Sequence, residues 1–532
     1  MGPGEPLTGP RRRTLLAGAA ALAACGRDAA GPPPAAWVGA RHERGHRLRQ
    51  GAPLPAAEVQ RRAGVLVLGA GIAGLAAARA LARRGVDDVQ ILELEDEPGG
   101  NSRGHVMAGM GCPLGAHYLP LPGPEAHEVA EWLHEIGLLK TAHGRTLPDE
   151  RHLCHSPQER LFVDGAWAEG LLPPVDPASD AARQMQAFGR RITELHRSGA
   201  FTLPAHRGRR TPEAAALNTQ TFAQWLDGQG LRDMHLRWYL DYCCRDDYGA
   251  AADAVSARAG VHYFASRHGF HAPGDEPAAE REGLFTWPEG NAWLARRLAA
   301  PFAGGQLHGG RTVLQVAERR HEVQVLAWDE QGQRAEAWTA RAAVLALPLF
   351  VAARIVESPP AALQQAAALL GYAPWLVANL QLDAPLLARA GAPPSWDNVI
   401  YGSSGLGYVD AMHQSLNAVP GATVLTAYRA LPRAERSALL ADDAAAWAAR
   451  VLADLAVVHP DIGRRTQRVD LMRWGHAMAI PAPGVMQHPA LAALRASRGR
   501  LRFAHADLAG CSVFEESFTA GCEAGTGLES FV

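Results

Sequence analysis

A strand, a glycine turn and a helix follow one another near residue 70, and this junction constrains the fold more than any other segment. Val65 to Leu68 are consecutive apolar residues, as in a parallel strand that is buried on both faces. Gly69, Gly71 and Gly74 follow, and an alanine-rich helical stretch begins at once. A buried strand that turns directly into a helix is one half of a βαβ unit, so the segment predicts an α/β fold with a parallel sheet.

The spacing of these glycines is typical of a turn that binds a dinucleotide. Gly69 permits the tight turn, Gly71 lets the backbone approach a pyrophosphate, and Gly74 allows the helix to pack closely on the strand. The free N–H groups and the positive end of the helix dipole then hold the diphosphate. Glu93 lies 24 residues after Gly69, at the end of the next apolar run, where a carboxylate can accept hydrogen bonds from ribose hydroxyls.

A second glycine motif and a C-terminal segment complete the pattern. Gly99, Gly100 and Arg103 lie just after the acidic strand, and Asp507 lies in the segment 501–510. With these motifs the chain resembles the flavin-containing amine oxidase superfamily over about residues 60 to 532. The resemblance implies FAD as the cofactor, and it places the following residues at the FAD site: Gly69, Gly71, Gly74, Glu93, Gly99, Gly100, Arg103, Gly115 beside the flavin, Val313 on the adenine-side strand, and Asp507 near the ribityl-diphosphate.

The order of the motifs predicts the domain organisation. Segments 61–120, 281–350 and 476–532 would form a doubly wound, Rossmann-like FAD-binding domain, and an α+β substrate domain would be inserted as 121–280 and 351–475. No second GxGxxG motif follows a strand, so we expect no NAD(P) domain and expect the flavin to receive its electrons from the substrate. Patterns predict helices at 125–139, 221–226, 360–370 and 434–457, strands at 375–382 and 424–428, and a hairpin at 161–167 that turns at Asp164-Gly165.

The first 60 residues are set apart from this domain. Arg11-Arg12-Arg13 and the apolar stretch 15–24 resemble a twin-arginine signal, and 22–25 resembles a lipobox that would make Cys25 the lipidated mature N-terminus. We therefore expect residues 1–25 to direct export, to the periplasm or to a membrane-anchored state. Residues 26–60 contain Gly31-Pro-Pro-Pro34 and little apolar periodicity, which predicts a flexible tether.

Composition excludes some classes of function. The formal charge is −2 over 532 residues, so the chain lacks the concentrated positive charge of a nucleic-acid-binding protein. Six cysteines remain after Cys25, at positions without a small-domain spacing, and we expect buried free thiols rather than disulfides. His152, Cys154 and His155 crowd into one loop without a distant pair of ligands, so we predict no metal site.

Candidate substrate-facing residues lie in segments that abut the flavin in the superfamily. His117 belongs to Gly115-Ala-His-Tyr118, and Trp474 and His476 lie just before the last cofactor segment; these three are the predicted catalytic residues. Trp375, Trp396 and Tyr401 are further candidates. Many amine oxidases of this superfamily keep a lysine near flavin N5, but the matching strand segment 376–379 has none. We therefore expect a histidine to replace the lysine, or the reaction to differ.

These observations predict an FAD-dependent oxidoreductase of the amine oxidase type. It would transfer a hydride from a small amine, possibly a polyamine, to flavin N5, and would pass electrons to oxygen or to a membrane or periplasmic carrier. Two alternatives stay open: a desaturase or isomerase of a lipid-like substrate on the same flavin scaffold, and a flavoprotein without turnover that serves as a binding protein.

Overall fold

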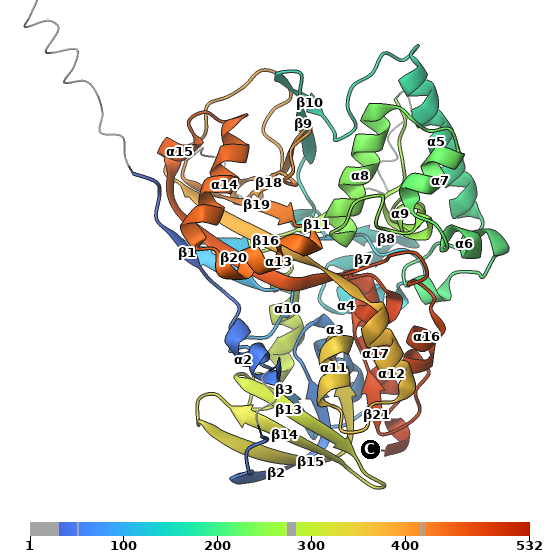
Figure 1. Ribbon diagram of the computed structural model, residues 1–532, viewed down its shortest axis with the longest axis vertical. Coiled ribbons are helices and arrows are strands. Elements are labelled where there is room, and N and C mark those ends of the chain that lie inside the picture. Colours follow the sequence, from blue (N-terminus) through green and yellow to red (C-terminus); the bar gives the residue numbers. More distant parts are fainter. Residues whose placement is uncertain (1–30, 50–52, 274–282, 415–418, 420, 532) are drawn as a thin grey trace, which may run out of the picture.

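The computed structural model describes residues 31–49, 53–273, 283–414, 419 and 421–531. A seven-stranded sheet and an eight-stranded sheet organise it. Figure 1 shows the first sheet with its helices at the bottom, and the second sheet beside a group of helices at the top. The chain passes between the two parts several times.

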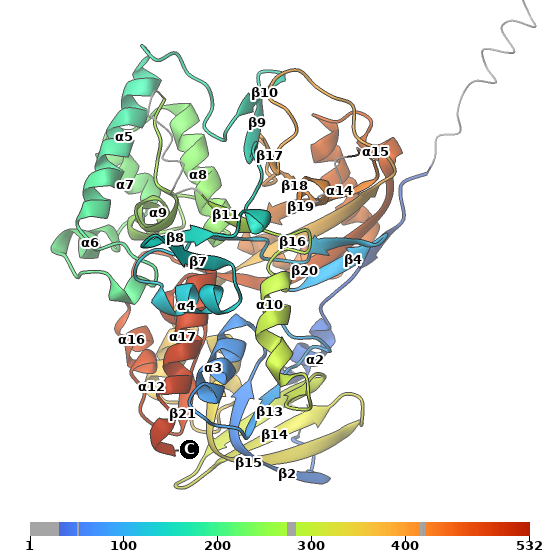
Figure 2. The same cartoon turned by 180° about the vertical axis from the view of Figure 1, so that it is seen from behind.

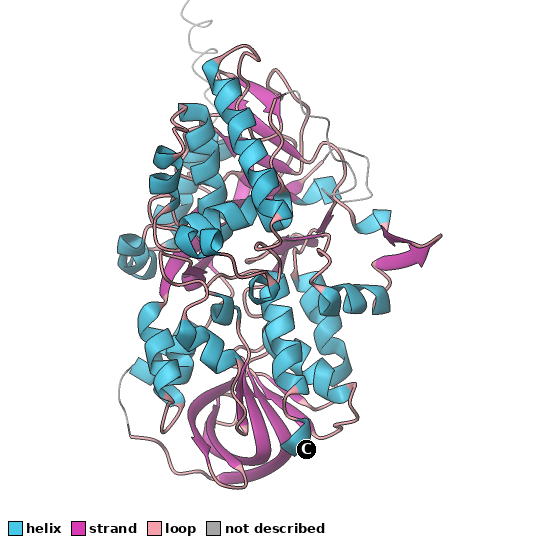
Figure 3. Ribbon diagram, turned by 90° about the vertical axis from the view of Figure 1, so that its right-hand side faces the viewer, coloured by secondary structure: helices cyan, strands magenta, loops and turns pink. Residues whose placement is uncertain are grey.

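The seven-stranded sheet is built around the strand that precedes the glycine turn. Its order is β12-β3-β2-β15-β14-β13, with β21 also paired to β15. The pairs β12-β3, β3-β2, β2-β15 and β15-β21 are parallel, whereas β13, β14 and β15 form an antiparallel meander (Figure 3). The strands are β2 Val59–Leu68, β3 Val89–Leu92, β12 Leu307–His308, β13 Arg311–Glu318, β14 Val323–Asp329, β15 Arg334–Leu345 and β21 Leu501–Phe503.

Side chains of β2 alternate between two apolar cores because successive strand residues point to opposite faces of the sheet. Val65 and Val67 pack toward α3, α4, α10 and α17 (Figure 2), and Leu66 and Leu68 pack toward α11, α12 and α16. Layers on both faces confirm the doubly wound architecture. The helices are α3 Ile72–Ala82, α4 His127–Glu135, α10 Ala292–Ala299, α11 Leu349–Ile355, α12 Ala361–Leu369, α16 Pro489–Arg495 and α17 Phe514–Thr526.

The eight-stranded sheet separates two further cores in the same way. Along β16, Leu376 and Ala378 pack against α14 and α15, whereas Trp375 and Val377 pack on the helical group α5–α9. The sheet order is β1-β20-β16-β19-β18-β17-β9-β10. The strands are β1 Ala35–Trp37, β9 Glu159–Val163, β10 Ala166–Glu169, β16 Gly371–Leu382, β17 Asp397–Ile400, β18 Tyr408–Asp410, β19 Thr423–Ala430 and β20 Thr466–Ile480.

The helices of this upper part fall into two groups. One group is α5 Asp180–Arg197, α6 Pro212–Leu217, α7 Phe222–Gly228, α8 Met234–Tyr248 and α9 Ala257–Tyr263, and the other is α13 Arg436–Ala441, α14 Ala444–Ala456 and α15 Ile462–Arg465. Three small two-stranded sheets connect the parts: β4 Gly104–Met107 with β5 Met110–Pro113, β6 Tyr118–Pro120 with β11 Leu284–Thr286, and β7 Leu139–Ala142 with β8 Arg145–Pro148.

Most expected elements are present, and one is divided. The hairpin turns at Asp164 and Gly165, both with positive φ, as a type I′ turn requires. The helix expected at 434–457 is broken into α13 and α14, because Asp443 takes an extended conformation and caps α14 by accepting from Ala446 N. The six cysteines within the described ranges are free and buried. None of the helices described is long and apolar enough to cross a membrane.

The expected flexible tether is wrong for its central part. Residues 35–49, which we call the N-terminal strap, form β1, the short helix α2 His42–His46 and a helical turn at Arg47–Arg49. β1 pairs in parallel with Val469–Leu471 of β20, so backbone hydrogen bonds that the sequence did not reveal hold the strap against the sheet. Residues 1–25 lie outside the described residues.

Candidate functional site

The glycine turn between β2 and α3 is crowded on one side and open on the other. A Cβ at Gly74 would lie 1.9 Å from the Gly69 carbonyl oxygen, so the helix packs on the turn too closely for a side chain. At Gly71 a Cβ would meet only the Gly100 Cα, at 3.8 Å. Gly71 is also the N-cap of α3 and supplies no side-chain cap. The first N–H groups of α3 therefore face a space that a diphosphate could use.

The second glycine motif lies against the first. Gly99 N donates to Ala70 O at 2.8 Å, and Gly71 and Gly99 form an isolated parallel bridge. Gly100 has a φ of +56°, and a Cβ there would come within 3.2 Å of the Gly71 Cα. The structure thus brings together four of the glycines that the sequence placed at the FAD site, Gly69, Gly71, Gly99 and Gly100.

Glu93 connects the two parallel strands on this side. Its buried carboxylate accepts from Ala70 N at 2.6 Å and from Glu95 N at 2.9 Å. Burial raises its pKa, while these two N–H donors and Arg103 oppose that shift. An acidic group held at the end of β3 beside the first glycine turn has the position that ribose recognition requires.

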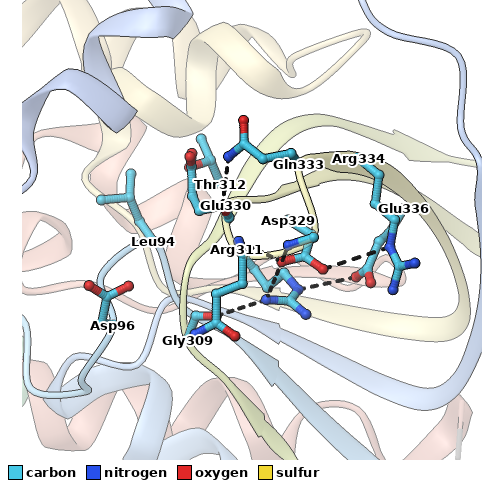
Figure 4. A network of polar contacts seen from close by, with 12 residues as sticks. Leu94, Asp96, Gly309, Arg311, Thr312, Asp329, Glu330, Gln333, Arg334 and Glu336 are labelled. Atoms are coloured by element: carbon cyan, nitrogen blue, oxygen red, sulfur yellow. Dashed lines mark hydrogen bonds and ion pairs between the residues drawn. The ribbon is translucent and has the colours of Figure 1, made fainter.

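A polar network supports the loop that carries Glu93 (Figure 4). Arg311 N donates to Glu93 O at 2.7 Å, and the Arg311 guanidinium contacts Gly309 O at 3.0 Å, Asp329 at 2.9 Å and Glu336 at 3.3 Å. Glu336 is fully buried, so its charge depends on these cationic partners. Val313 follows two residues later in β13, at a register shift, with its side chain in an apolar core.

Asp507 holds protein groups together beneath the C-terminal helix. Its fully buried carboxylate accepts from Leu349 N at 2.9 Å and from Tyr372 Oη at 2.6 Å, and the His505 ring lies 3.2 Å away. Burial alone would raise its pKa, but His505, Tyr372 and Leu349 together lower it. Asp507 therefore joins the helical turn after β21 to the start of α11 and the start of β16, a role in positioning these elements that the sequence did not indicate.

His117 lies in a group of aromatic rings, which we call the aromatic group: His117, Tyr118, Trp396 and Tyr428. The His117 ring stacks on Tyr428 at 4.4 Å and lies 5.4 Å from Trp396. Tyr428 Oη donates to Gly115 O at 3.2 Å. A small cavity beside His117 and Trp396 is also lined by Trp287 and Asp410.

Trp474 approaches the same segment from β20. Its Nε1 donates to Leu114 O at 2.7 Å, and the guanidinium of Arg103 lies 5.4 Å from its ring centroid. A Cβ at Gly115 would lie 3.6 Å from the Trp474 ring and 2.2 Å from Asn101 O. Segment 114–117 is therefore enclosed by Trp474 on one side and the aromatic group on the other, with Gly115 fitting because it has no side chain.

His476 does not join the aromatic group. Its ring packs against Phe350 at 4.8 Å and Tyr372 at 5.9 Å, and Tyr372 in turn binds Asp507. Burial, helped by the nearby charges of Arg436 and Arg49, lowers the pKa of His476 to about 4. The three predicted catalytic residues thus divide into His117 and Trp474 around segment 114–117, and His476 on the Asp507 side.

The two predicted histidines, His117 and His476, are both neutral at neutral pH. Burial lowers the pKa of His117 to about 3, so its ring is neutral and a weak proton acceptor at neutral pH. In the segment 376–379 the polar residue is Asn379, which is fully buried and donates to Pro113 O at 3.0 Å. Desolvation therefore disfavours the imidazolium, and the expectation that a histidine replaces the lysine stays a prediction.

Three acids, one buried and two half-buried, lie near the aromatic group, and the sequence did not indicate them. Burial, then Asp247 and Glu159, raise the pKa of Asp246 to about 7, and burial raises that of Asp247 to about 6. Asp247 pairs with Arg267 at 3.3 Å, whereas Asp246 has no hydrogen bond or ion pair with any residue in the described ranges. Burial, then the charge of Asp246, raise the pKa of Tyr118, so this carboxylate lies near the aromatic group.

Asp397 adds a third acid on the other side. It follows Trp396 in β17, and burial, then Glu159 and Asp246, raise its pKa well above the ordinary value. The signal that could have revealed the acids is the adjacent pair Asp246-Asp247 in α8, a helix whose neighbouring residues Tyr242 to Cys244 and Tyr248 are buried. Of the other candidates, Trp375 lies 6.4 Å from Tyr428, whereas Tyr401 packs on Trp238 away from the aromatic group.

Comparison with known proteins identifies the scaffold. The family model "Flavin containing amine oxidoreductase" matches residues 72–526. Among solved structures, the fold is similar to wild-type putrescine oxidase bound to putrescine, with 20% identity, coverage of 88% of this chain and 100% of that chain, and a TM-score of 0.65. It is also similar to cyclohexylamine oxidase from Brevibacterium oxydans IH-35A, with 18% identity, coverage of 87% and 98%, and a TM-score of 0.64.

A third similar structure has a different substrate. The CLA-producing fatty acid isomerase from P. acnes matches with 15% identity, coverage of 87% of this chain and 98% of that chain, and a TM-score of 0.61. A search of curated protein sequences finds no match. At these identities the structural likeness shows the fold, and the family model covers most of the chain. The chain therefore belongs to the flavin-containing amine oxidoreductase family, and it is an FAD-dependent oxidoreductase.

Proposed function

We propose that this enzyme oxidises a small amine, and that the ammonium group of the substrate is recognised beside the aromatic group by Asp246. The observation that carries the proposal is the half-buried carboxylate of Asp246, which makes no hydrogen bond or ion pair in the described ranges and lies near Tyr118 of the aromatic group, with only the weaker, more distant charges of Arg267 and Arg245 opposing its raised pKa. Aromatic faces and a desolvated carboxylate both attract a cation. A fatty carboxylate would be repelled at the same place, which favours an amine over a lipid acid.

The chain's residues fit FAD. The open side of Gly71, the uncapped N-terminus of α3 and the buried Glu93 carboxylate match a diphosphate followed by a ribose. Bound FAD would supply the hydride acceptor for the amine. The aromatic group and Trp474 would orient the substrate carbon and exclude water from it. Sites of this kind accelerate a reaction chiefly by positioning the reacting atoms.

Asp246 is the group best suited to handle the ammonium proton. Its pKa of about 7 lies near neutral pH, where a carboxylate can both attract a cation and accept a proton. The neutral ring of His117 then serves as a wall of the pocket. We propose a primary amine or a polyamine as substrate, because both neighbouring amine oxidases act on amines by their names.

Anaerobic mixing tests this proposal. The oxidised enzyme is combined separately with putrescine, cyclohexylamine and linoleate, and flavin absorbance is followed by stopped flow. Bleaching by an amine, but not by linoleate, supports the proposal. Flavin bleaching by linoleate alone, or isomerisation of linoleate, would instead support the lipid-acting alternative. No reaction with any of the three compounds would favour a binding role.

We further propose that the protein is exported and anchored through Cys25. The support is the sequence Arg11-Arg12-Arg13 before an apolar stretch and a lipobox-like segment. β1 starts at Ala35, so a lipid on Cys25 would hold the enzyme within roughly 35 Å of the membrane surface. Oxygen or a membrane carrier would accept the electrons. Changing Arg11 and Arg12 to lysine should abolish export, and changing Cys25 to alanine should release the enzyme into the soluble fraction; unchanged fractionation of both would refute the assignment.

A further inference from the structure

The N-terminal strap connects the two parts of the fold on the cofactor side. Its first half extends the eight-stranded sheet: Val38 N donates to Leu471 O at 2.8 Å, and the Arg473 guanidinium lies 4.6 Å from the Trp37 ring centroid. Its second half reaches the seven-stranded sheet, where Arg47 pairs with Glu330 at 3.0 Å. A segment that precedes β2 in sequence thus spans from β20 to the strands that carry the glycine turn.

The strap binds the loop that follows Glu93 through the side chain of Arg44. Arg44 Nη1 donates to Leu94 O at 2.8 Å, and Arg44 Nη2 pairs with Asp96 at 2.8 Å. Figure 4 shows Leu94 and Asp96 at the edge of the network formed by β13, β14 and β15. The Arg44 side chain is only 14% exposed, so these contacts are shielded more than an ordinary surface ion pair.

Glu95 connects the strap to Glu93 and Arg103, two of the residues expected to bind FAD. Its carboxylate accepts from Arg41 N at 3.0 and 3.2 Å and pairs with Arg103 at 3.5 Å. Its own N–H donates to the Glu93 carboxylate at 2.9 Å. The orientation of Glu93, which lies beside the first glycine turn, therefore depends on a loop whose outer side is held by the strap.

We propose that the N-terminal strap is part of the FAD site, with Arg44 acting as a positioning residue that fixes the Glu93–Asp96 loop for ribose binding. The strap does not touch the reacting atoms. It holds the loop in its binding geometry before FAD arrives, and so removes an ordering cost from the binding step. The proposal rests on FAD as the cofactor and is independent of the substrate.

Coupling of this kind is reciprocal. If a docked strap tightens FAD binding by some factor, bound FAD must favour the docked strap by the same factor. The strap carries its own probe of docking, because Arg41, Arg44, Arg47 and Arg49 are trypsin sites within nine residues. Where docking equilibrates faster than cleavage, the rate of cutting reports the undocked population.

The first test is an FAD titration of the full-length apoprotein carrying Arg44→Ala. We expect the Kd for FAD to rise about ten-fold, the usual effect of losing a charge-assisted contact, and Arg44→Lys to recover part of the loss. Arg319→Ala is the matched control: it removes an arginine just after β13 that pairs with Glu357, outside the strap. Its Kd should stay within about two-fold of wild type.

The second test measures trypsin cutting in the strap with and without FAD. We expect FAD to slow cutting in the wild type, and to slow it less in Arg44→Ala. A lower apoprotein melting temperature together with an unchanged Kd would mean that the strap is only structural, and would overturn the proposal. So would cutting that is insensitive to FAD. If Arg44→Ala does not fold, the same comparisons are made with Arg44→Lys.

Discussion

Replacing Asp246 by asparagine should make the protein more stable in mildly alkaline solution. Burial, then Asp247 and Glu159, raise the pKa of this carboxyl from 3.8 to about 7. At about 1.4 kcal/mol per pKa unit, ionising it in the folded protein costs up to about 4 kcal/mol. Asp246 retains partial contact with solvent, so we expect screening to leave about 2 kcal/mol.

The sign of the pH dependence follows from the raised pKa. Below about pH 4 the carboxyl is protonated in the folded and unfolded states, so Asp246 carries no penalty. As the pH rises from about 4 to 7 the unfolded state releases its proton first, and wild-type stability falls relative to the variant. The full difference is reached above about pH 7.

Urea unfolding of holoenzyme at about pH 4.5 and pH 8 measures the difference. Asp246→Asn should match the wild type at the lower pH, within about 0.5 kcal/mol, and exceed it by about 2 kcal/mol at the higher pH. The control is Asp253→Asn, an exposed carboxyl shortly after α8, which should change neither value. Equal stability of Asp246→Asn and wild type at the higher pH would refute the claim that the folded protein raises the pKa of this carboxyl. Asp246→Asn should also raise the Kd for the amine by about ten-fold, because a charged group that binds substrate is often kept at a cost in stability.

Three other predictions concern the cofactor, the pocket and the thiols. Gly71→Ala should weaken FAD binding at least about ten-fold without lowering apoprotein stability, because its Cβ meets no other protein atom closer than 3.8 Å. The control Gly463→Ala replaces a helical glycine with open space around it and should change neither property. Normal FAD content in Gly71→Ala would show that the diphosphate does not bind at this turn. His117→Ala and Trp474→Ala should keep FAD content near wild type and slow amine-driven flavin reduction by about ten-fold, and His476→Ala should slow it less. Wild-type reduction rates in all three variants would mean that other residues line the pocket. Dithiothreitol should leave the melting temperature unchanged, since the six described cysteines are free, and a drop would reveal a disulfide.

The nucleotide-binding half could be predicted from sequence because its constraints are local. Gly69, Gly71 and Gly74 are required by a turn whose geometry is set within a few residues, and the structure places Gly99 directly against that turn. Alternation along β2 likewise determines which side chains face each layer. Such features depend on neighbours in the chain, so periodicity and spacing reveal them.

The substrate side depends on contacts between distant residues, and here the sequence was less informative. Asp246 lies more than a hundred residues from Tyr118, and only the folded chain shows that this half-buried carboxylate lies near that ring. The strap was expected to be a tether because its apolar residues lack a period, yet it is held by pairing with β20 and by Arg44. The sequence likewise did not reveal that His117 is neutral, because only the fold shows the burial that lowers its pKa to about 3.

A single anaerobic turnover analysed for products tests amine oxidation most directly. The enzyme is mixed with excess putrescine in the absence of oxygen, quenched after flavin reduction, and assayed for aldehyde and ammonia. Removal of a hydride and a proton from the amine, followed by hydrolysis of the resulting imine, yields one aldehyde and one ammonia for each flavin reduced. We expect this stoichiometry with the wild type and a much lower yield over the same interval with Asp246→Asn. Flavin reduction without ammonia would contradict the account.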